Sequence, residues 1–186
     1  MPYIETIQPD QADGDLKDIY DGLIESRGKI AEVHKIQSLN PASIVNHMDL
    51  YMTIMFGKSP LKRVDREMMA VVVSIENKCE YCQTHHLEAV KNFWRDDSKL
   101  DSFQRDFENA GLDEKEKALC HFAKDLTKNP EKSNDAGLVN PLKEIGLSDR
   151  EILDATLVVA YFNFVNRIVL GLGVELENNP GGYKYD

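Results

Sequence analysis

The sequence has only three cysteines among its 186 residues, and it has no long apolar run, no basic cluster and no recognisable β-hairpin turn. Three cysteines cannot form a framework of several structural disulfides. The longest apolar runs fall well short of the ~20 residues that a membrane-spanning helix needs. Residues 1–7 also lack the basic and apolar regions of a signal peptide. We therefore expect a cytoplasmic protein with no membrane partner.

Positive charge is also scarce. Lysine and arginine total 22 against 32 acidic residues, which gives a net charge of −10 and an isoelectric point of about 5.0. Such a chain is repelled by a phosphate backbone, so we expect no nucleic-acid partner. The 42% hydrophobic and 29% charged residues are typical of a folded protein. The length suits a single domain over residues 1–186 with a sizeable core.

Helical periodicity and capping signals, without any strand pair, predict an all-α fold. Helices are expected over residues 16–28, 40–57, 66–76, 79–94, 113–129 and 148–171, with weaker helices near 100–109 and 134–145. The valines at 71–73 would suit a strand, but their segment is too long and does not alternate, so we predict a buried helix. Breaks are expected at 77–78 and 96–98, an extended lead-in over 1–14 and a loose tail at 179–182.

One short stretch brings together a dithiol, an imidazole and a carboxylate. Cys79 and Cys82 form a Cys-x-x-Cys pair, His86 follows the second cysteine by four residues, and Glu67 precedes the first by twelve. On a helix that begins at Cys79, both thiols and the imidazole share one packed face. That face continues through Ala89, Val90 and Phe93. Without an export signal, such a cysteine pair is more typical of a catalytic or metal-binding site than of a structural one.

The position of each thiol favours a reactive sulfur. Cys79 is expected in the first turn of its helix, where free N–H groups and the helix dipole lower a thiol pKa from ~8.5. His86 lies one turn beyond Cys82, within reach to accept its proton. The pattern therefore predicts a redox site. The proximity of His86 favours Cys82 as the attacking sulfur. The position at the helix terminus favours Cys79 instead.

The carboxylate can be placed by counting residues. If the two helices form an antiparallel hairpin that turns at 77–78, a rise of ~1.5 Å per residue puts Glu67 level with residues 86–88. Glu67 would then lie beside His86, where it orients the imidazole and stabilises its charged form. The alternative, a helix N-terminal carboxylate, needs a capping partner, and Val64 at the corresponding position cannot serve.

An internal echo suggests two related halves. The triplet Asp65-Arg66-Glu67 recurs as Asp149-Arg150-Glu151, each time before a long apolar helix. Glu151 follows Ser148 by three residues, as in a capping box, and needs no further role. The shift of 84 residues (149 minus 65) sets Asn163 against Cys79, Asn166 against Cys82 and Leu170 against His86. We expect a duplicated helical hairpin, with an active half at about 40–95 and a degenerate half at about 112–175.

Zinc binding is the main competing interpretation. Cys79, Cys82 and His86 supply three ligands, and the fourth would come from His85, Cys120 or His121. Structural zinc sites usually bring their ligands in two spaced pairs, whereas the last two of these residues are adjacent. A zinc-binding structural or interaction module and a general thiol–disulfide oxidoreductase therefore stand as alternatives to a peroxide-reducing enzyme.

The other polar candidates have ordinary structural interpretations. Cys120 is expected to be a small buried side chain, and His85 to be solvated on the opposite side of its helix. Single histidines such as His34 and His47 are more often structural than functional. Tyr81, between the two cysteines, either donates a hydrogen bond at the site or packs, and the sequence does not decide between these roles.

The chain resembles the alkylhydroperoxidase AhpD-like branch of the carboxymuconolactone decarboxylase superfamily. The pattern that carries the resemblance is Glu67, eleven residues, Cys79-Glu-Tyr-Cys82, three residues and His86. Two further stretches are similar to the peroxidase-related subgroup. They are ADGDLKDIY at 12–20, and YFNFVNR at 161–167 with GLG at 171–173. The similarity spans nearly the whole chain.

The resemblance implies an all-helical fold with an internal duplication, assembled as a homo-oligomer, often a trimer or hexamer. It also implies that Cys79 and Cys82 reduce peroxides by cycling through a disulfide, with Glu67 and His86 as a proton relay. Tyr81 stands where better-studied members have a second histidine, which implies a shorter relay. The decarboxylase branch lacks the cysteine pair, so the resemblance disfavours that reaction.

These expectations combine into one mechanism. His86, held by Glu67, takes the proton of Cys82, and the thiolate attacks an oxygen of a small-molecule peroxide. The resulting sulfenic acid condenses with Cys79. An external dithiol or protein reductant then reduces the disulfide. We expect no cofactor and no metal besides this redox-active disulfide.

Overall fold

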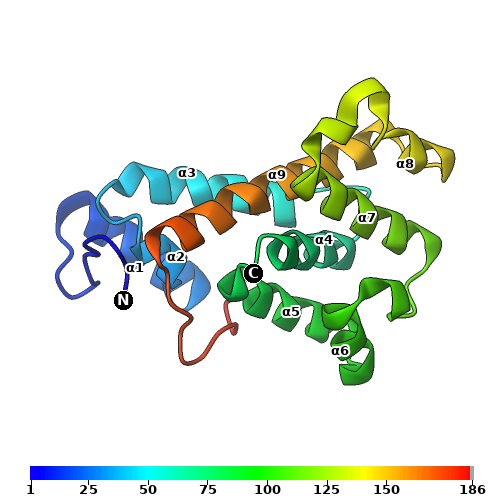
Figure 1. Ribbon diagram of the computed structural model, residues 1–186. Coiled ribbons are helices and arrows are strands. Elements are labelled where there is room, and N and C mark those ends of the chain that lie inside the picture. The colour runs from blue at the N-terminus through cyan, green and yellow to red at the C-terminus, as the bar shows by residue number, and fades with distance from the viewer. Residues whose placement is uncertain (185–186) are drawn as a thin grey trace.

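The computed structural model describes residues 1–184, and this range is helical with no β-strand, which confirms the predicted all-α fold (Figure 1). The elements in chain order are α1 (Gly14–Arg27), α2 (Glu32–Lys35), α3 (Pro41–Tyr51), η1 (Met52–Phe56), α4 (Arg63–Glu76), α5 (Glu80–Trp94), α6 (Asp97–Arg105), η2 (Phe107–Asn109), α7 (Glu114–Lys128), η3 (Pro130–Ala136), α8 (Asn140–Glu144) and α9 (Asp149–Leu172). The η1 segment is a π-helical turn, and η2 and η3 are 3₁₀-helical.

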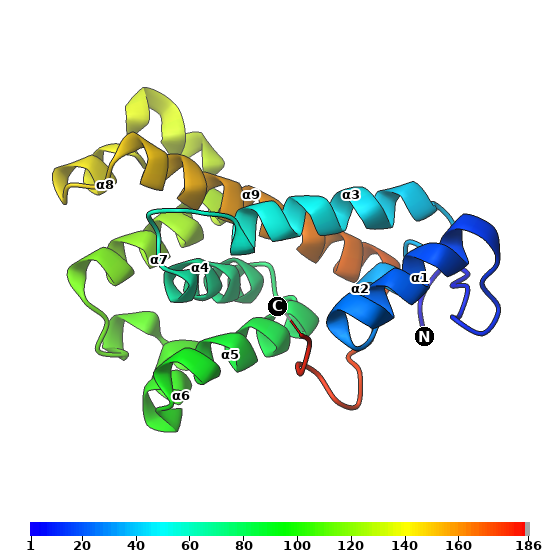
Figure 2. The same ribbon diagram turned by 180° about the vertical axis from the view of Figure 1, so that it is seen from behind.

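Helix α4 is the centre of the bundle. It packs against α5, α7 and α9, which surround it in both views (Figures 1 and 2). Every residue from Asp65 to Ser74 is buried, because these neighbours cover the helix on all sides. The valines at 71–73 belong to this buried run, so tertiary packing overrides their preference for a strand. The predicted buried helix is confirmed, and it begins at Arg63, three residues earlier than expected.

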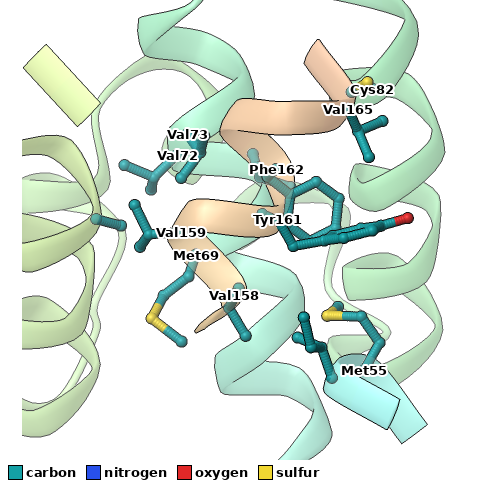
Figure 3. Packing of buried hydrophobic residues seen from close by; sticks show 14 of the residues in the cluster. Met55, Met69, Val72, Val73, Cys82, Val158, Val159, Tyr161, Phe162 and Val165 are labelled. Atoms are coloured by element: carbon teal, nitrogen blue, oxygen red, sulfur yellow. The ribbon is translucent and has the colours of Figure 1, made fainter. Parts of the chain in front are cut away.

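The core around α4 is built largely from aliphatic and aromatic side chains of α4 and α9. Figure 3 shows members of this cluster, among them Met69, Val72, Val73, Val158, Val159 and Phe162. Full burial of one such large side chain stabilises the fold by roughly 1.5–3 kcal/mol. The packing of these two helices therefore holds the polar groups of the site in fixed positions.

A tight corner folds α5 back along α4. Asn77 ends α4, and Lys78 adopts a left-handed conformation with a φ of 58°. The N–H of Cys79 then donates to the Ser74 carbonyl at 2.8 Å, which closes the turn. The predicted corner and the antiparallel hairpin are confirmed. Cys79 is the N-cap residue of α5 and lies one position before the first turn in which it was expected.

Helix α9 is a single uninterrupted helix of 24 residues. The Glu151 carboxylate accepts the Ser148 N–H at 2.9 Å, and the Ser148 hydroxyl accepts the Glu151 N–H at 3.3 Å, so the predicted capping box is confirmed. The helix continues through the positions that echo the 77–78 corner, so this segment does not turn back as α4 and α5 do. By length and hydropathy alone α9 would suit a membrane span, but in this structure it packs against α4 and α7 as part of the helical bundle.

Three local expectations differ from the structure. The break expected at 96–98 falls at 95–96, because the Asp96 carboxylate accepts the Lys99 N–H at 3.0 Å and caps α6. The helix expected near 134–145 is shorter, since the chain completes η3 before α8 begins. The C-terminal tail is not loose as far as Lys184, whose N–H donates to the Arg27 carbonyl at 3.0 Å.

Candidate functional site

The candidate site lies where the α4–α5 hairpin meets α9, α2 and the C-terminal tail. A cavity of about 60 Å³ is present there. Its wall includes Cys82 and His86 from α5, His34 from α2 and Phe162 from α9. A space of this size accommodates a few water molecules or a very small ligand. Two of the predicted site residues, Cys82 and His86, therefore face one cavity.

Glu67 lies beside His86, as the hairpin arithmetic predicted. The distance from Glu67 Oε2 to His86 Nδ1 is 2.6 Å, and the Glu67 side chain is fully buried. The imidazole also packs edge-on against the ring of Phe162, with centroids 4.5 Å apart. These contacts fix the orientation of the ring and leave Nε2 as the atom that can exchange a proton.

Arg63 is a second partner of Glu67 that the sequence analysis missed. Its Nε donates to Glu67 Oε1 at 2.8 Å, and a terminal guanidinium nitrogen donates to the same oxygen. Burial raises the pKa of Glu67, but the charges and hydrogen bonds of His86 and Arg63 outweigh it and hold the pKa below its ordinary value. Glu67 is therefore a carboxylate at neutral pH. The i,i+4 spacing of Arg63 and Glu67 was the available signal.

Capping does not explain Glu67. The N-cap of α4 is Lys62, whose N–H donates to the Asp65 carboxylate at 3.2 Å. The expectation that Val64 occupies the cap position is wrong, because the helix begins at Arg63. Glu67 lies in the second turn, beyond the free N–H groups of the helix end. The conclusion that Glu67 is not a capping carboxylate is nevertheless correct, since Asp65 takes that role.

Cys79 and Cys82 are buried free thiols at the start of α5. A hydrogen bond from Cys82 to Cys79 lowers the pKa of Cys79 despite the opposing effect of burial. The same hydrogen bond, together with burial and the charge on Cys79, raises the pKa of Cys82. Cys79 is thus the sulfur that ionises more readily, whereas Cys82 is the sulfur that lines the cavity.

Asn166 of α9 joins both arms of the hairpin. It is fully buried, its amide nitrogen donates to Ser74 Oγ at 3.2 Å, and its amide oxygen accepts from Asn77 at 3.0 Å. Its hydrogen bond to Cys82 offsets part of the pKa rise that Cys79 and burial cause at that thiol. Asn163 also accepts from Asn77 at 3.0 Å. The sequence comparison set these asparagines opposite the two sulfurs, and the structure brings them to the hairpin itself.

The C-terminal tail reaches the site through Glu177. The Glu177 carboxylate accepts the Tyr81 hydroxyl at 2.7 Å and the Glu32 N–H at 2.9 Å, and it lies 2.8 Å from His85 Nε2. Burial raises the pKa of Glu177, but these hydrogen bonds outweigh it and bring the pKa to about 2. Tyr81 therefore donates a hydrogen bond rather than only packing. The expectation that His85 is solvated is wrong, since the tail covers it.

The predicted helix face is wrong at its far end. Val90 is fully buried, but Phe93 is 52% exposed. Phe93 lies in the last turn of α5, where it lines an open hollow together with Arg63 of α4. The buried face therefore extends from the two sulfurs and His86 to Val90 and ends before Phe93.

The fourth zinc ligands proposed from the sequence are engaged elsewhere. Cys120 is buried in α7, as predicted. His121 pairs with Glu108 at 2.6 Å, and His85 is held by Glu177. Within residues 1–184 no group of three or more histidine, cysteine, aspartate or glutamate side chains is arranged to hold a metal ion. The geometry does not support the zinc interpretation.

His34 and His47 are both buried, and the contacts of His47 are structural. Its Nε2 lies 2.7 Å from the Tyr161 hydroxyl, and its Nδ1 lies 2.8 Å from the Gln37 amide nitrogen. Burial lowers the pKa of His47 to about 4 and lowers that of His34 as well. His34 Nδ1 has no hydrogen-bond partner within the described residues. Both rings are neutral at pH 7, so His34 contributes no positive charge to the cavity wall.

Comparison with known proteins gives a family match and several structural matches. Residues 46–101 match the family described as carboxymuconolactone decarboxylase. This range contains Glu67, Cys79, Cys82 and His86. A search of curated proteins finds no match to the chain.

Solved structures share the fold over most of the chain. An AhpD-core, peroxidase-related protein of Ralstonia eutropha JMP134 has a TM-score of 0.83 at 19% identity, over 95% of this chain and 93% of that one. A peroxidase-related protein of Silicibacter sp. TM1040 has a TM-score of 0.81 at 27% identity, over 95% and 94%. The debrominase Bmp8 has a TM-score of 0.77 at 19% identity, over 95% and 92%. A cysteine-to-alanine variant of that debrominase forms a complex with 2,3,4-tribromopyrrole.

The family match covers the hairpin that carries the candidate site, and the shared fold extends to the rest of the described chain. Together they support the resemblance of this chain to the AhpD-like branch of the carboxymuconolactone decarboxylase superfamily, and the structural matches show that it shares the AhpD-like fold.

Proposed function

We propose that this chain is a cytoplasmic, thiol-dependent hydroperoxide reductase of the antioxidant type. The observation that carries the proposal is the Glu67–His86 pair, whose imidazole faces the same cavity as Cys82. A cysteine attacks only as its thiolate, and a base supported by a carboxylate can generate that thiolate on demand. The peroxidase-related proteins among the structural matches support the same class of activity.

In the first step, His86 accepts the proton of Cys82 at Nε2 while Glu67 stabilises the imidazolium through Nδ1. The Cys82 thiolate attacks one oxygen of the hydroperoxide, and the O–O bond breaks. The departing alkoxide takes the proton from His86 and leaves as an alcohol, or as water when the substrate is hydrogen peroxide. Cys82 becomes a sulfenic acid, and the peroxide has gained two electrons.

In the second step, the Cys79 thiolate attacks the sulfenic sulfur of Cys82. The S–O bond breaks, and the hydroxide leaves as water once it is protonated. In the resting protein the Cys82 thiol donates to Cys79 and lowers the pKa of Cys79, and the resolving sulfur attacks as its thiolate. An external dithiol then exchanges with the Cys79–Cys82 disulfide, becomes oxidised and restores both thiols.

Access supports this order of events. Cys82 lines the cavity, whereas Cys79 is fully buried behind it. The raised pKa of Cys82, which the hydrogen bond to Cys79 causes first and burial second, means that it is a thiol at rest. Its activation therefore depends on His86, which is the dependence expected of an attacking residue served by a general base.

The competing activities fit the geometry less well. A general thiol–disulfide oxidoreductase must accept disulfides of many different proteins, whereas Cys82 is only 2% exposed and is accessible only to a small or closely fitting dithiol. Debromination, the activity for which Bmp8 is named, would place a ring with bulky bromine atoms beside Cys82. The cavity there is about 60 Å³, whereas pockets for organic ligands usually measure ~300 Å³ or more. A small hydroperoxide is the substrate that this space accommodates.

Peroxide consumption with an added dithiol tests the proposal. We expect turnover of hydrogen peroxide by the unmodified protein and none by Cys82→Ser. Cys120→Ser is the matched control, because Cys120 is an equally buried thiol in α7 that the mechanism does not use. Equal consumption by the unmodified protein and Cys82→Ser would refute the proposal.

We also propose that the chain forms a homo-oligomer, a trimer or a hexamer. Large apolar side chains on α3 and α9 are exposed, including Val45, Leu50, Leu153, Leu157 and Phe164. An apolar surface of this kind is typical of an interface between subunits. Light scattering on the protein as it elutes from a size-exclusion column measures the subunit number. A monomer at all concentrations would contradict the proposal.

A further inference from the structure

The C-terminal tail, residues 177–184, forms a strap across the candidate site. It leaves the end of α9 near α2 and returns toward α5 (Figures 1 and 2). The Glu177 carboxylate fixes one end of the strap to Tyr81 and His85 of α5, and the Lys184 N–H fixes the other end to α1. Between these points, Lys29 Nζ donates to the carbonyl of Asn179 at 2.7 Å. The strap is therefore tied down along its length.

Tyr183 of the strap lies between two hollows. One is the 60 Å³ cavity that contains Cys82, and the other measures about 340 Å³ and is lined in part by Phe56 and Phe93. Tyr183 and His85 line both hollows, and their rings are 5.8 Å apart. These two rings therefore form a partition between the thiol and the larger hollow, whose wall also includes Arg63 and Glu67.

Several contacts hold the ring of Tyr183 in this partition. Arg27 and Lys29 place their cations 4.9 Å and 4.5 Å from its centroid. Its hydroxyl lies 3.4 Å from Glu177 Oε1, the same oxygen that accepts from Tyr81. Cation–π contacts of this kind contribute roughly 0.5–1 kcal/mol at exposed sites and more when shielded from water. The position of the ring thus depends on the strap and on its Glu177 anchor.

We propose that Tyr183 determines the substrate size of this site and restricts it to small hydroperoxides. This inference rests on the proposed peroxide reductase activity. With the ring in place, a substrate at Cys82 has only the small cavity. Without it, the two hollows join, and a hydroperoxide with a bulky apolar group can place that group in the larger hollow, against Phe56 or Phe93, while its peroxide reaches Cys82 and His86.

The first test compares hydrogen peroxide with cumene hydroperoxide as substrates of Tyr183→Ala. We expect the ratio of kcat/KM for cumene hydroperoxide to that for hydrogen peroxide to rise about tenfold or more, as is typical when a steric block in a pocket is relieved. Lys184→Ala is the matched control, since it changes the neighbouring exposed residue of the strap, and its ratio should equal that of the unmodified protein. An unchanged ratio in Tyr183→Ala would overturn the proposal.

The second test does not require peroxidase activity. Cys82 is alkylated with iodoacetamide, which is small, or with N-(1-pyrenyl)maleimide, which is bulky, and the product is mapped by peptide mass spectrometry. We expect the bulky-to-small rate ratio to rise in Tyr183→Ala and in Glu177→Ala, which releases the strap without removing the ring. If the protein consumes no peroxide but this ratio rises, the proposed function fails and the strap's control of access stands. An unchanged ratio in both folded variants overturns the inference.

Discussion

His86 Nδ1 lies 2.6 Å from Glu67 Oε2, although the two residues are 19 positions apart on different helices. The contact exists because the Asn77–Lys78 corner folds α5 back along α4. Arg63 binds the other carboxylate oxygen at 2.8 Å, and His86 and Arg63 together hold the pKa of Glu67 below its ordinary value despite burial, so Glu67 is ionised before any substrate arrives. The imidazole is therefore held in one orientation, with a fixed negative charge behind it and Cys82 in the same cavity.

Glu67→Gln should slow the enzyme without abolishing its activity. The amide preserves the shape of the side chain but removes the charge that stabilises the His86 imidazolium, and a positioned general base contributes at least ~10²-fold to rate. We expect kcat/KM for hydrogen peroxide to fall by about that factor. Glu151→Gln is the matched control, because Glu151 is a capping carboxylate in the related triplet. Equal losses in the two variants would contradict the assigned role of Glu67.

The two cysteine variants should differ in whether a sulfenic acid accumulates after peroxide treatment. In Cys79→Ser the resolving thiol is absent, so stoichiometric peroxide should leave a sulfenic acid at Cys82 that dimedone labels. In Cys82→Ser no sulfenic acid should form at Cys79, because that sulfur lies away from the cavity and from His86. Peptide mass spectrometry identifies the labelled residue. Labelling of Cys79 in Cys82→Ser, with none at Cys82 in Cys79→Ser, would reverse the assignment.

Asn166 should help Cys82 to ionise. Its amide hydrogen bond lowers the pKa of that thiol, so Asn166→Leu should shift the pH dependence of Cys82 alkylation to higher pH. A hydrogen bond to a charged group contributes ~1.5 kcal/mol or more, which corresponds to about a tenfold fall in kcat/KM at neutral pH. Asn163→Leu is the control, since Asn163 binds the same Asn77 but not the thiol. Coincident alkylation profiles for the two variants would rule out this role.

The Glu177 anchor should weaken in acid. The pKa of Glu177 is about 2 in the folded chain and ~4.3 in an unfolded one, so its carboxylate stabilises the fold fully above ~4.3 and loses that contribution as the pH falls toward 2. Glu177 faces Tyr81, His85 and Tyr183. The difference in melting temperature between the unmodified protein and Glu177→Gln should therefore be largest near neutral pH and shrink over that acid range. A difference that does not change with pH would show that the charge is not what holds the strap.

The hairpin was predictable because its signals are local. Asn77-Lys78 marks a corner, and a constant rise per residue then places Glu67 opposite His86 without knowledge of the rest of the fold. The capping box of Ser148 and Glu151 was predictable for the same reason, since both partners lie within one helical turn.

The remaining contacts join segments that no spacing rule connects. Glu177 and Tyr81 are 96 positions apart, and the tail that carries Glu177 has a loop-like composition. The cap of α4 was misassigned because the repeated triplet is not used alike in the two helices. Asp65, the first residue of its triplet, and Glu151, the third of its own, both cap their helices. Matching the triplets residue by residue therefore assigned the wrong cap to α4.

The central claim is that Cys79 and Cys82 form a redox pair driven by peroxide. The most direct test is mass spectrometry of the native protein after one equivalent of hydrogen peroxide, with peptide mapping under non-reducing conditions. The account predicts the loss of two hydrogens, a Cys79–Cys82 disulfide, a free Cys120 and full reversal by an added dithiol. Unchanged thiols at Cys79 and Cys82 would contradict it.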